Sequence, residues 1–272
     1  MRVAIIGGAG RVGSQIAYAL ASSTLPIDRL QLYDVVDSVK GEALDLQHAM
    51  KALGKHLRIS ATGLDDCRGA DVIVFVAGLP LSKAGTLDRN SLAKENSKIL
   101  TETFEKLKDA RSIYIIITNP VDVMTQLAAK LVGDRRRVIG VSTLTDTCRM
   151  EGQGYLMGEH GGNMFCIGNE QTDPAQIKEA GLEVVKLKGG TWFTVASLIR
   201  RVVSAIINDE KVMLPVSCSL RGEFGYSDIA LSVPCVIGKN GVEMVEKPNL
   251  TKEQRTILDK AAESVRSVLS TI

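Results

Sequence analysis

The first half of the chain alternates short apolar runs with amphipathic segments of helical period. The runs with strand character lie at 3–6, 30–33, 58–61, 72–76, 112–117 and 138–141. The helical patterns between them lie at 11–21, 41–50, 92–108 and 121–131. Strands that are apolar on both faces, separated by helices, are typical of a parallel sheet covered on both sides. The alternation therefore predicts a doubly wound α/β domain over residues 1–141.

The pattern changes after about residue 142. Strand candidates there alternate more between apolar and polar residues, as at 229–237, and Asn240-Gly241 is a typical hairpin turn. A closing helix is predicted over Lys252–Leu269, with Thr251 as its N-cap. We expect an α+β domain over 142–272, an antiparallel sheet with helices packed on it. No low-complexity linker precedes it, so the two halves should be closely joined.

Composition excludes several classes of protein. The formal net charge is +2, from 33 basic and 31 acidic residues, and the basic run Arg135–Arg137 is short, so we expect no nucleic-acid partner. No apolar stretch approaches the ~18 residues that span a bilayer, so we expect no membrane association. Five scattered cysteines without a CxxC pair indicate reduced thiols and no metal site. With no signal-peptide pattern before the first strand, we expect a cytoplasmic protein.

A glycine-rich loop joins the first strand to the first helix. Two registers fit it: G-x-G-x-x-G at Gly8, Gly10 and Gly13, and G-x-x-G-x-x-G beginning at Gly7. Such a loop permits a tight turn and brings a pyrophosphate to the amides of the helix N-terminus, as in Rossmann domains. Asp34 ends the second strand, where a carboxylate accepts hydrogen bonds from the adenosine ribose. No basic residue follows it closely, which favours NAD over NADP.

A second group of residues suits proton transfer. His160 lies in a glycine-flanked loop, Gly158-Glu159-His160-Gly161-Gly162, and Asp146 precedes Arg149 by three positions, which places both on one helical face. A buried Asp beside a His fixes its tautomer and raises its pKa, giving a proton donor and acceptor near neutrality. The guanidinium of Arg149 offers a fork for a carboxylate. A solvated loop histidine is the plainer interpretation of His160 alone.

Seven motifs occur together in the order found in the lactate/malate dehydrogenase superfamily, which this chain resembles over nearly its whole length. The motifs are Gly8–Gly13, Gly41–Ala49, Ala77-Gly78, Thr118–Thr125, Asp146-x-x-Arg149, Gly158–Gly161 and Gly222–Gly225. The resemblance is strongest to the archaeal-type malate dehydrogenases. It implies a Rossmann domain followed by an α+β catalytic domain, and hydride transfer between NAD and a 2-hydroxy or 2-oxo acid.

The resemblance also implies roles for individual residues. His160 exchanges the hydroxyl proton, Asp146 orients His160, and Arg149 holds the substrate's C1 carboxylate. Arg89 matches the mobile-loop arginine that polarises the reacting carbonyl, Asn119 contacts substrate or nicotinamide ribose, and Thr191 matches a pocket wall. Plainer roles are a solvated helix start, a turn before Pro120 and core packing, respectively. The implied coenzyme contacts are Gly7, Gly8, Gly10, Arg11, Val12, Gly13, Asp34, Ala77, Gly78, Asn96, Thr118 and Asn119.

The chain departs from the family pattern in its substrate half. Lys83 stands six residues before Arg89, where malate enzymes carry an arginine for the distal carboxylate, and it offers a point charge in place of a fork. Only fourteen positions separate Asp146 from His160, about half the family spacing, and the stretch from His160 to Thr191 is also short. We expect this shortening to expose apolar surface or alter the oligomer, expected to be a homodimer or homotetramer.

The leading interpretation is an NAD-dependent malate dehydrogenase that interconverts (S)-malate and oxaloacetate, an enzyme of the tricarboxylic acid cycle. An L-lactate or other 2-hydroxy-acid dehydrogenase is the alternative in the same class. An NAD-binding protein with weakened or no catalysis is the alternative of another class, motivated by the shortened second domain. A related NAD- and metal-dependent glycosidase is disfavoured, since the Gly-Glu-His-Gly loop is present and a Cys/His metal constellation is not.

Overall fold

A computed structural model describes residues 1–79, 88–107 and 110–272. The first half forms six parallel strands in the order β3-β2-β1-β4-β5-β6. Their bounds are β1 Arg2–Ile6, β2 Arg29–Tyr33, β3 Arg58–Ala61, β4 Val72–Phe75, β5 Ile113–Ile116 and β6 Val138–Gly140. The direction of winding reverses between β1 and β4, and ligands of such sheets bind at this point, beyond the carboxyl ends of the strands. The predicted doubly wound sheet is confirmed.

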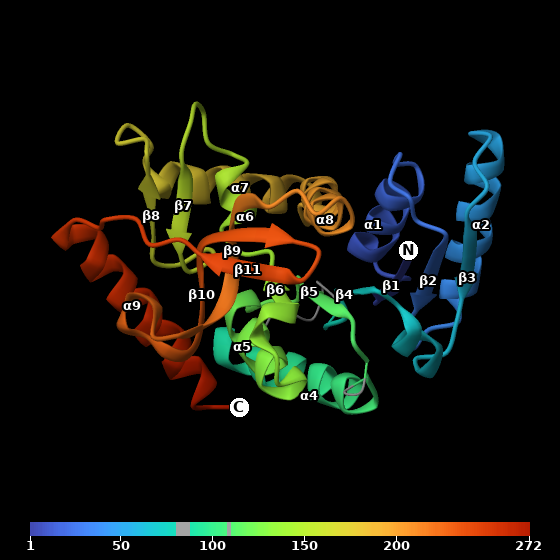
Figure 1. Ribbon diagram of the computed structural model, residues 1–272, viewed down its shortest axis with the longest axis horizontal. Helices are drawn as coiled ribbons and strands as arrows, with labels where there is room; N and C mark the ends of the chain where they lie inside the picture. The colour runs from blue at the N-terminus through green and yellow to red at the C-terminus, as the bar shows by residue number, and fades with distance from the viewer. Residues whose placement is uncertain (80–87, 108–109) are drawn as a thin grey trace.

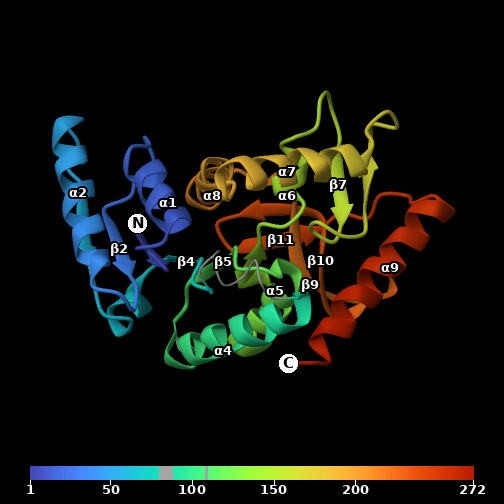
Figure 2. The same ribbon diagram turned by 180° about the vertical axis from the view of Figure 1, so that it is seen from behind.

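Helices cover both faces of this sheet. They are α1 Arg11–Ala21, α2 Ser38–Ala52, α4 Arg89–Leu107 and α5 Val121–Val132. Figure 1 shows α4 and α5 below the strands and α1 above them, and Figure 2 shows the same division from behind. The strands are buried on both sides, with Val3, Ile5 and Val74 completely inaccessible, which explains why they are apolar throughout.

The sheet continues into the second half instead of ending at β6. Gly140 of β6 pairs antiparallel with Ser217 of β9, and the order runs on through β10, β7 and β8, with β11 pairing to β10. The bounds are β7 Tyr155–Gly158, β8 Met164–Ile167, β9 Val212–Arg221, β10 Ser227–Gly238 and β11 Gly241–Val245. The predicted hairpin at Asn240-Gly241 is confirmed. The two halves are therefore joined through one sheet.

The helices of the second half are α6 Leu144–Thr147, α7 Pro174–Lys188, α8 Trp192–Ile207 and α9 Lys252–Leu269. Short 3₁₀ helices occur at Asp65–Gly69, Arg135–Arg137 and Glu223–Gly225. Thr251 caps α9 as predicted, in a capping box with Gln254. The cap fixes where α9 begins.

Helix α7 lies on the surface with little cover. Gly181 is its only buried residue, whereas Leu182, Val185 and Leu187 are exposed, as is Phe193 at the start of α8. These four side chains form an exposed apolar surface on the second half.

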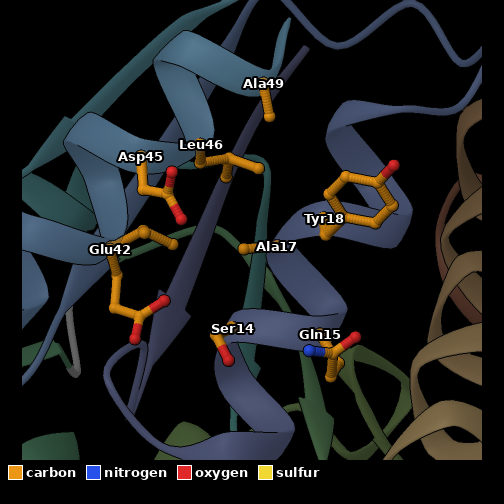
Figure 3. Close-up of a pocket in the computed structure, with 9 residues that line it drawn as sticks. Ser14, Gln15, Ala17, Tyr18, Glu42, Asp45, Leu46 and Ala49 are labelled. Atoms are coloured by element: carbon orange, nitrogen blue, oxygen red, sulfur yellow. The ribbon is translucent and has the colours of Figure 1, made fainter.

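A second uncovered feature is an open cleft of about 330 Å³ between α1 and α2. Figure 3 shows Ser14 and Ala17 of α1 on the side of that helix that faces Glu42, Asp45 and Leu46 of α2. The cleft lies between helices and not at the carboxyl ends of the strands, where the ligand of a doubly wound sheet binds.

Candidate active site

The glycine loop follows β1 at the point where the winding reverses. Gly7 has a φ of +96°, and a Cβ there would lie 2.7 Å from the backbone N of Ala77. A Cβ on Gly13 would lie 2.1 Å from the carbonyl oxygen of Gly7. Gly10 has more room, with its nearest neighbour at 3.4 Å. Gly10 and Gly13 belong to both registers, so the choice depends on Gly7 and Gly8. A Cβ on Gly8 would lie 3.0 Å from Cβ of Leu32, whereas Gly7 has the positive φ and the closer backbone neighbour, which favours the register that begins at Gly7.

The first turn of α1 leaves its backbone amides available. No side chain caps the helix, and no acidic residue lies in its first turn. The amides of Arg11, Val12 and Gly13 therefore have no acceptor within the helix. Free amides at a helix N-terminus form a site for a phosphate group. The guanidinium of Arg11 lies 5.4 Å from the ring centroid of Trp192, against α8.

Asp34 lies beside this loop, at the end of β2. Its Oδ2 accepts a hydrogen bond from the amide of Ala9 at 3.0 Å, and its Oδ1 accepts one from Val35 at 2.8 Å. Each oxygen keeps a further lone pair for a hydroxyl donor. A pyrophosphate on the helix terminus and a ribose on Asp34 would therefore be held by adjoining segments.

The ends of β4 and β5 are tied together across the site. The Thr118 hydroxyl donates to the carbonyl of Ala77 at 2.7 Å, and a Cβ on Gly78 would lie 2.9 Å from Cγ2 of Thr118. Asn96, which is buried, donates to the carbonyl of Asn119 at 2.7 Å and accepts from the amide of Leu79 at 2.9 Å. The side-chain amide of Asn96 thus joins two loops, and it binds backbone atoms in both.

Asp146, Arg149 and His160 meet at one point. Nδ1 of His160 lies 2.6 Å from Oδ2 of Asp146, while Nη1 of Arg149 lies 2.9 Å from Oδ1 of the same carboxylate. Asp146 is 2% exposed, so its charge is shielded from water and compensated by these two partners. Because Asp146 occupies Nδ1, the other ring nitrogen of His160 is the one left for an external group.

The surroundings of His160 favour its protonated form. Burial opposes the charge, but the hydrogen bond that His160 donates to Asp146 and the charges of Asp146 and Asp122 outweigh it, so the pKa of His160 is raised. A histidine with a raised pKa keeps its proton to higher pH than an ordinary histidine does, and it can donate that proton to a developing alkoxide.

Sequence reasoning missed Asp122, which fixes the backbone of the loop that carries His160. Its Oδ2 accepts from the amide of His160 at 3.0 Å, and its Oδ1 accepts from the Ser142 hydroxyl at 2.8 Å. Burial raises the pKa of Asp122, and these hydrogen bonds counteract it. The available signal was an acid in the otherwise apolar first turn of α5, within the Thr118–Thr125 motif.

Sequence reasoning also missed Glu159, which binds Arg89. Glu159 is fully buried, and its carboxylate pairs with the guanidinium of Arg89 at the start of α4. Ser264 of α9 contacts both, donating to Glu159 at 3.1 Å and accepting from Arg89 at 2.8 Å. The role predicted for Arg89, polarising a carbonyl, requires it to exchange this partner for substrate.

Two further predicted residues lie outside this cluster. Thr191 precedes α8 and forms no side-chain cap there, beside Trp192 and the exposed Phe193. Lys83 lies outside the described residues.

Comparison with known proteins identifies the family. The lactate/malate dehydrogenase NAD-binding domain matches residues 1–140, and the lactate/malate dehydrogenase α/β C-terminal domain matches 170–272. L-lactate dehydrogenase 2 of Clostridium acetobutylicum is 32% identical, covering 97% of this chain and 95% of that protein. The chain belongs to the lactate/malate dehydrogenase family.

Solved structures of this family share the fold. Malate dehydrogenase of Archaeoglobus fulgidus, solved in complex with NADH, is 30% identical with a TM-score of 0.90, covering 99% of both chains. Malate dehydrogenase of Aeropyrum pernix is 30% identical with a TM-score of 0.87, covering 99% of this chain and 97% of that one. The coenzyme is NAD, and the protein is an NAD-dependent 2-hydroxy-acid dehydrogenase.

The family relatives also bear on size. The match to the Clostridium acetobutylicum enzyme extends over 309 residues, more than the 272 of this chain, so that relative carries segments that this one lacks.

Within the described part of the chain, no helix combines the length and apolarity needed to cross a membrane.

Proposed function

We propose that the protein is a malate dehydrogenase that interconverts (S)-malate and oxaloacetate with NAD. The observation that carries the reaction class is the Asp146 carboxylate, which holds His160 at 2.6 Å and Arg149 at 2.9 Å on separate oxygens. The substrate assignment rests on the ordered motifs, above all Thr118–Thr125, which resemble those of malate dehydrogenases; Lys83 would pair with the second carboxylate as a point charge.

The residues of the glycine loop fit the coenzyme, because Gly7 and Gly13 leave room that a Cβ would fill and the first amides of α1 are free. Asp34 would hold the ribose and the amides of Arg11–Gly13 the pyrophosphate. NAD, when bound, supplies the acceptor or donor of the hydride. The protein's own part is to orient substrate and to move the hydroxyl proton.

His160 would move that proton through the ring nitrogen not bound to Asp146. In the direction of reduction it donates to the carbonyl oxygen as the hydride arrives, and Asp146 stabilises the charged imidazolium before transfer. Arg149 keeps Nη2 and Nε for the C1 carboxylate, because Nη1 is bound to Asp146. Arg89, once released from Glu159, would polarise the carbonyl.

Lactate is the second candidate substrate, because curated relatives at 29–33% identity are named L-lactate dehydrogenase. A panel of 2-oxo acids, with NADH and NADPH in separate arms, decides between them. We expect a higher kcat/KM for oxaloacetate than for pyruvate, and for NADH than for NADPH. A clear preference for pyruvate would contradict the assignment of malate as the substrate. Tight NADH binding without turnover of any 2-oxo acid would contradict an enzymatic function.

A further inference from the structure

Three arginines stand side by side at the amino-terminal edge of the parallel sheet. Arg2, Arg29 and Arg58 are the first residues of β1, β2 and β3. The strand register pairs Arg2 with Arg29 and Arg29 with Arg58. Residues paired in register point to the same face of a sheet, and neighbouring strands lie about 4.8 Å apart. The three side chains therefore form a row over two strand spacings, called here the arginine row.

The arginine row faces a cleft. The cleft has a volume of about 590 Å³ and is lined by Arg2, Ile27, Asp28, Arg29, His56 and Arg58. The glycine loop and the catalytic cluster follow the carboxyl ends of the strands, so this cleft is at the opposite edge of the sheet. It is therefore separate from the site that holds the coenzyme.

The charges in this cleft are not balanced within the protein. Its one carboxylate, Asp28, pairs with the α-amino group of Met1, which also donates to the carbonyl of Pro26 at 3.1 Å. Among the residues that the structure describes, none of the three guanidinium groups forms a salt bridge or a side-chain hydrogen bond. Like charges paired in register on adjacent strands repel one another, so the arginine row is stable only with water or an anion between its members.

The carbonyl groups at the nearby helix end already have a cationic partner, so they do not occupy the arginine row. Helix α1 ends at Ala21 on the same edge, and its free carbonyls carry partial negative charge. Lys55 already donates to the carbonyls of Ser22 and Ser23, the first of them at 2.7 Å. The arginine row is thus left with donors to offer to an external ligand.

We propose that the arginine row is a binding site for a small anion carrying two or more phosphoryl groups. A guanidinium binds a phosphate through paired hydrogen bonds. The three guanidinium groups extend over two strand spacings, whereas a single phosphate is bound by one guanidinium. The row therefore matches a ligand with successive phosphoryl groups better than a single phosphate. The proposal does not depend on which 2-oxo acid the enzyme reduces.

Isothermal titration calorimetry with inorganic pyrophosphate tests this proposal. Saturating NADH is present throughout, so that the coenzyme site is filled. We expect one saturable site, with orthophosphate binding at least about tenfold more weakly. Arg29→Gln, in the middle of the row, should weaken pyrophosphate binding about tenfold or more, with kcat unchanged. Arg111→Gln is the matched control, because Arg111 is exposed and precedes β5 at the same edge of the sheet, outside the cleft.

Three results would overturn the proposal: no saturable heat with NADH bound, equal affinities for orthophosphate and pyrophosphate, or equal losses in the Arg29 and Arg111 variants. A separate arm with ADP identifies the source of the ligand. A lower Kd for ADP than for pyrophosphate supports a nucleoside diphosphate, and equal values support recognition of the phosphoryl groups alone.

Discussion

The coenzyme half and the substrate half of the active site are built differently. On the coenzyme side, the groups proposed to face the ligand are mostly backbone amides and glycine surfaces around Gly7 and Gly13, joined by the Asp34 carboxylate. On the substrate side they are charged side chains, and each already has a partner: Arg149 binds Asp146, and Arg89 binds Glu159. The first half presents an open cradle. On the substrate side, Arg149 would keep its bond to Asp146, whereas Arg89 would have to leave Glu159 to reach a substrate. The proposed function of that side therefore depends more strongly on individual side chains.

The largest effect that this comparison predicts is on His160. His160→Asn should lower kcat by about 10³–10⁴-fold, near the upper range for general acid–base catalysis, because it removes the group proposed to exchange the proton. The Kd of NADH should stay within twofold, since the coenzyme cradle is built from other segments. Steady-state kinetics and NADH fluorescence titration measure the two. His48→Asn, an exposed histidine on α2, is the control, and retained turnover in His160→Asn would refute the acid–base role.

Asp146→Asn tests how the buried carboxylate tunes that histidine. Reduction of the 2-oxo acid uses the protonated form of His160, whose pKa is raised. The kcat/KM for reduction should therefore be highest at low pH and fall as the pH rises through that pKa. The asparagine removes the hydrogen bond to a charged partner and leaves the opposing effect of burial. The alkaline limb of the pH profile should therefore move to lower pH, with a loss in kcat of about 10²-fold.

The same variant separates positioning from simple destabilisation of the fold. A misfolded site would lower the rate equally at every pH. If the alkaline limb of Asp146→Asn stays where the parent enzyme has it, Asp146 does not set the pKa of His160.

The elements were predictable from sequence because periodicity states which face of each segment is buried. The helix Arg11–Ala21 and the strand Arg58–Ala61 have the predicted bounds, and α9 begins after its predicted cap at Thr251. Asp34 is near the glycine loop for a similar reason, since a strand end and a loop at the same sheet edge must adjoin. These features follow from local pattern and from the topology of a parallel sheet.

The partners of the charged residues were not predictable in this way. Arg89 reaches Glu159 across 70 positions, and His160 rests on Asp122 across 38. Periodicity shows that a residue is buried, but not which distant residue compensates its charge. A buried glutamate beside His160 is a signal that some cation must be near, yet the sequence offers 33 candidates.

A smaller effect is expected on the coenzyme side. Asp34→Ser should raise the Kd of NADH about 10–100-fold, because a charged acceptor for the ribose hydroxyls contributes about 1.5–3 kcal/mol. It should also narrow the preference for NADH over NADPH, since the carboxylate repels a 2′-phosphate. The KM for the 2-oxo acid at saturating NADH should not change. If it rises as much as the Kd of NADH, the two halves are not independent.

The smallest effect concerns the ion pair that joins the halves, Arg135–Glu223 at 2.7 Å. Hydrogen bonds from Arg135 lower the pKa of Glu223 from 4.5 to about 2. A carboxylate whose pKa is lower in the folded than in the unfolded state stabilises the protein at pH values above its unfolded-state pKa. This contribution is lost as the pH falls from about 4.5 towards 2. Glu223→Gln should therefore lower the free energy of unfolding at pH 7 by about 2 kcal/mol. This is less than the loss of a fully buried ion pair, because both side chains are partly exposed.

Urea unfolding of Glu223→Gln at pH 7 and at pH 3 measures this contribution. The difference between variant and parent should shrink at pH 3, because Glu223 of the parent is then mostly protonated in the unfolded state but mostly ionised in the folded protein. Glu263→Gln, an exposed glutamate on α9, should change stability by less than about 0.5 kcal/mol at both pH values. An equal loss at both pH values would mean that packing, and not charge, holds the halves together here.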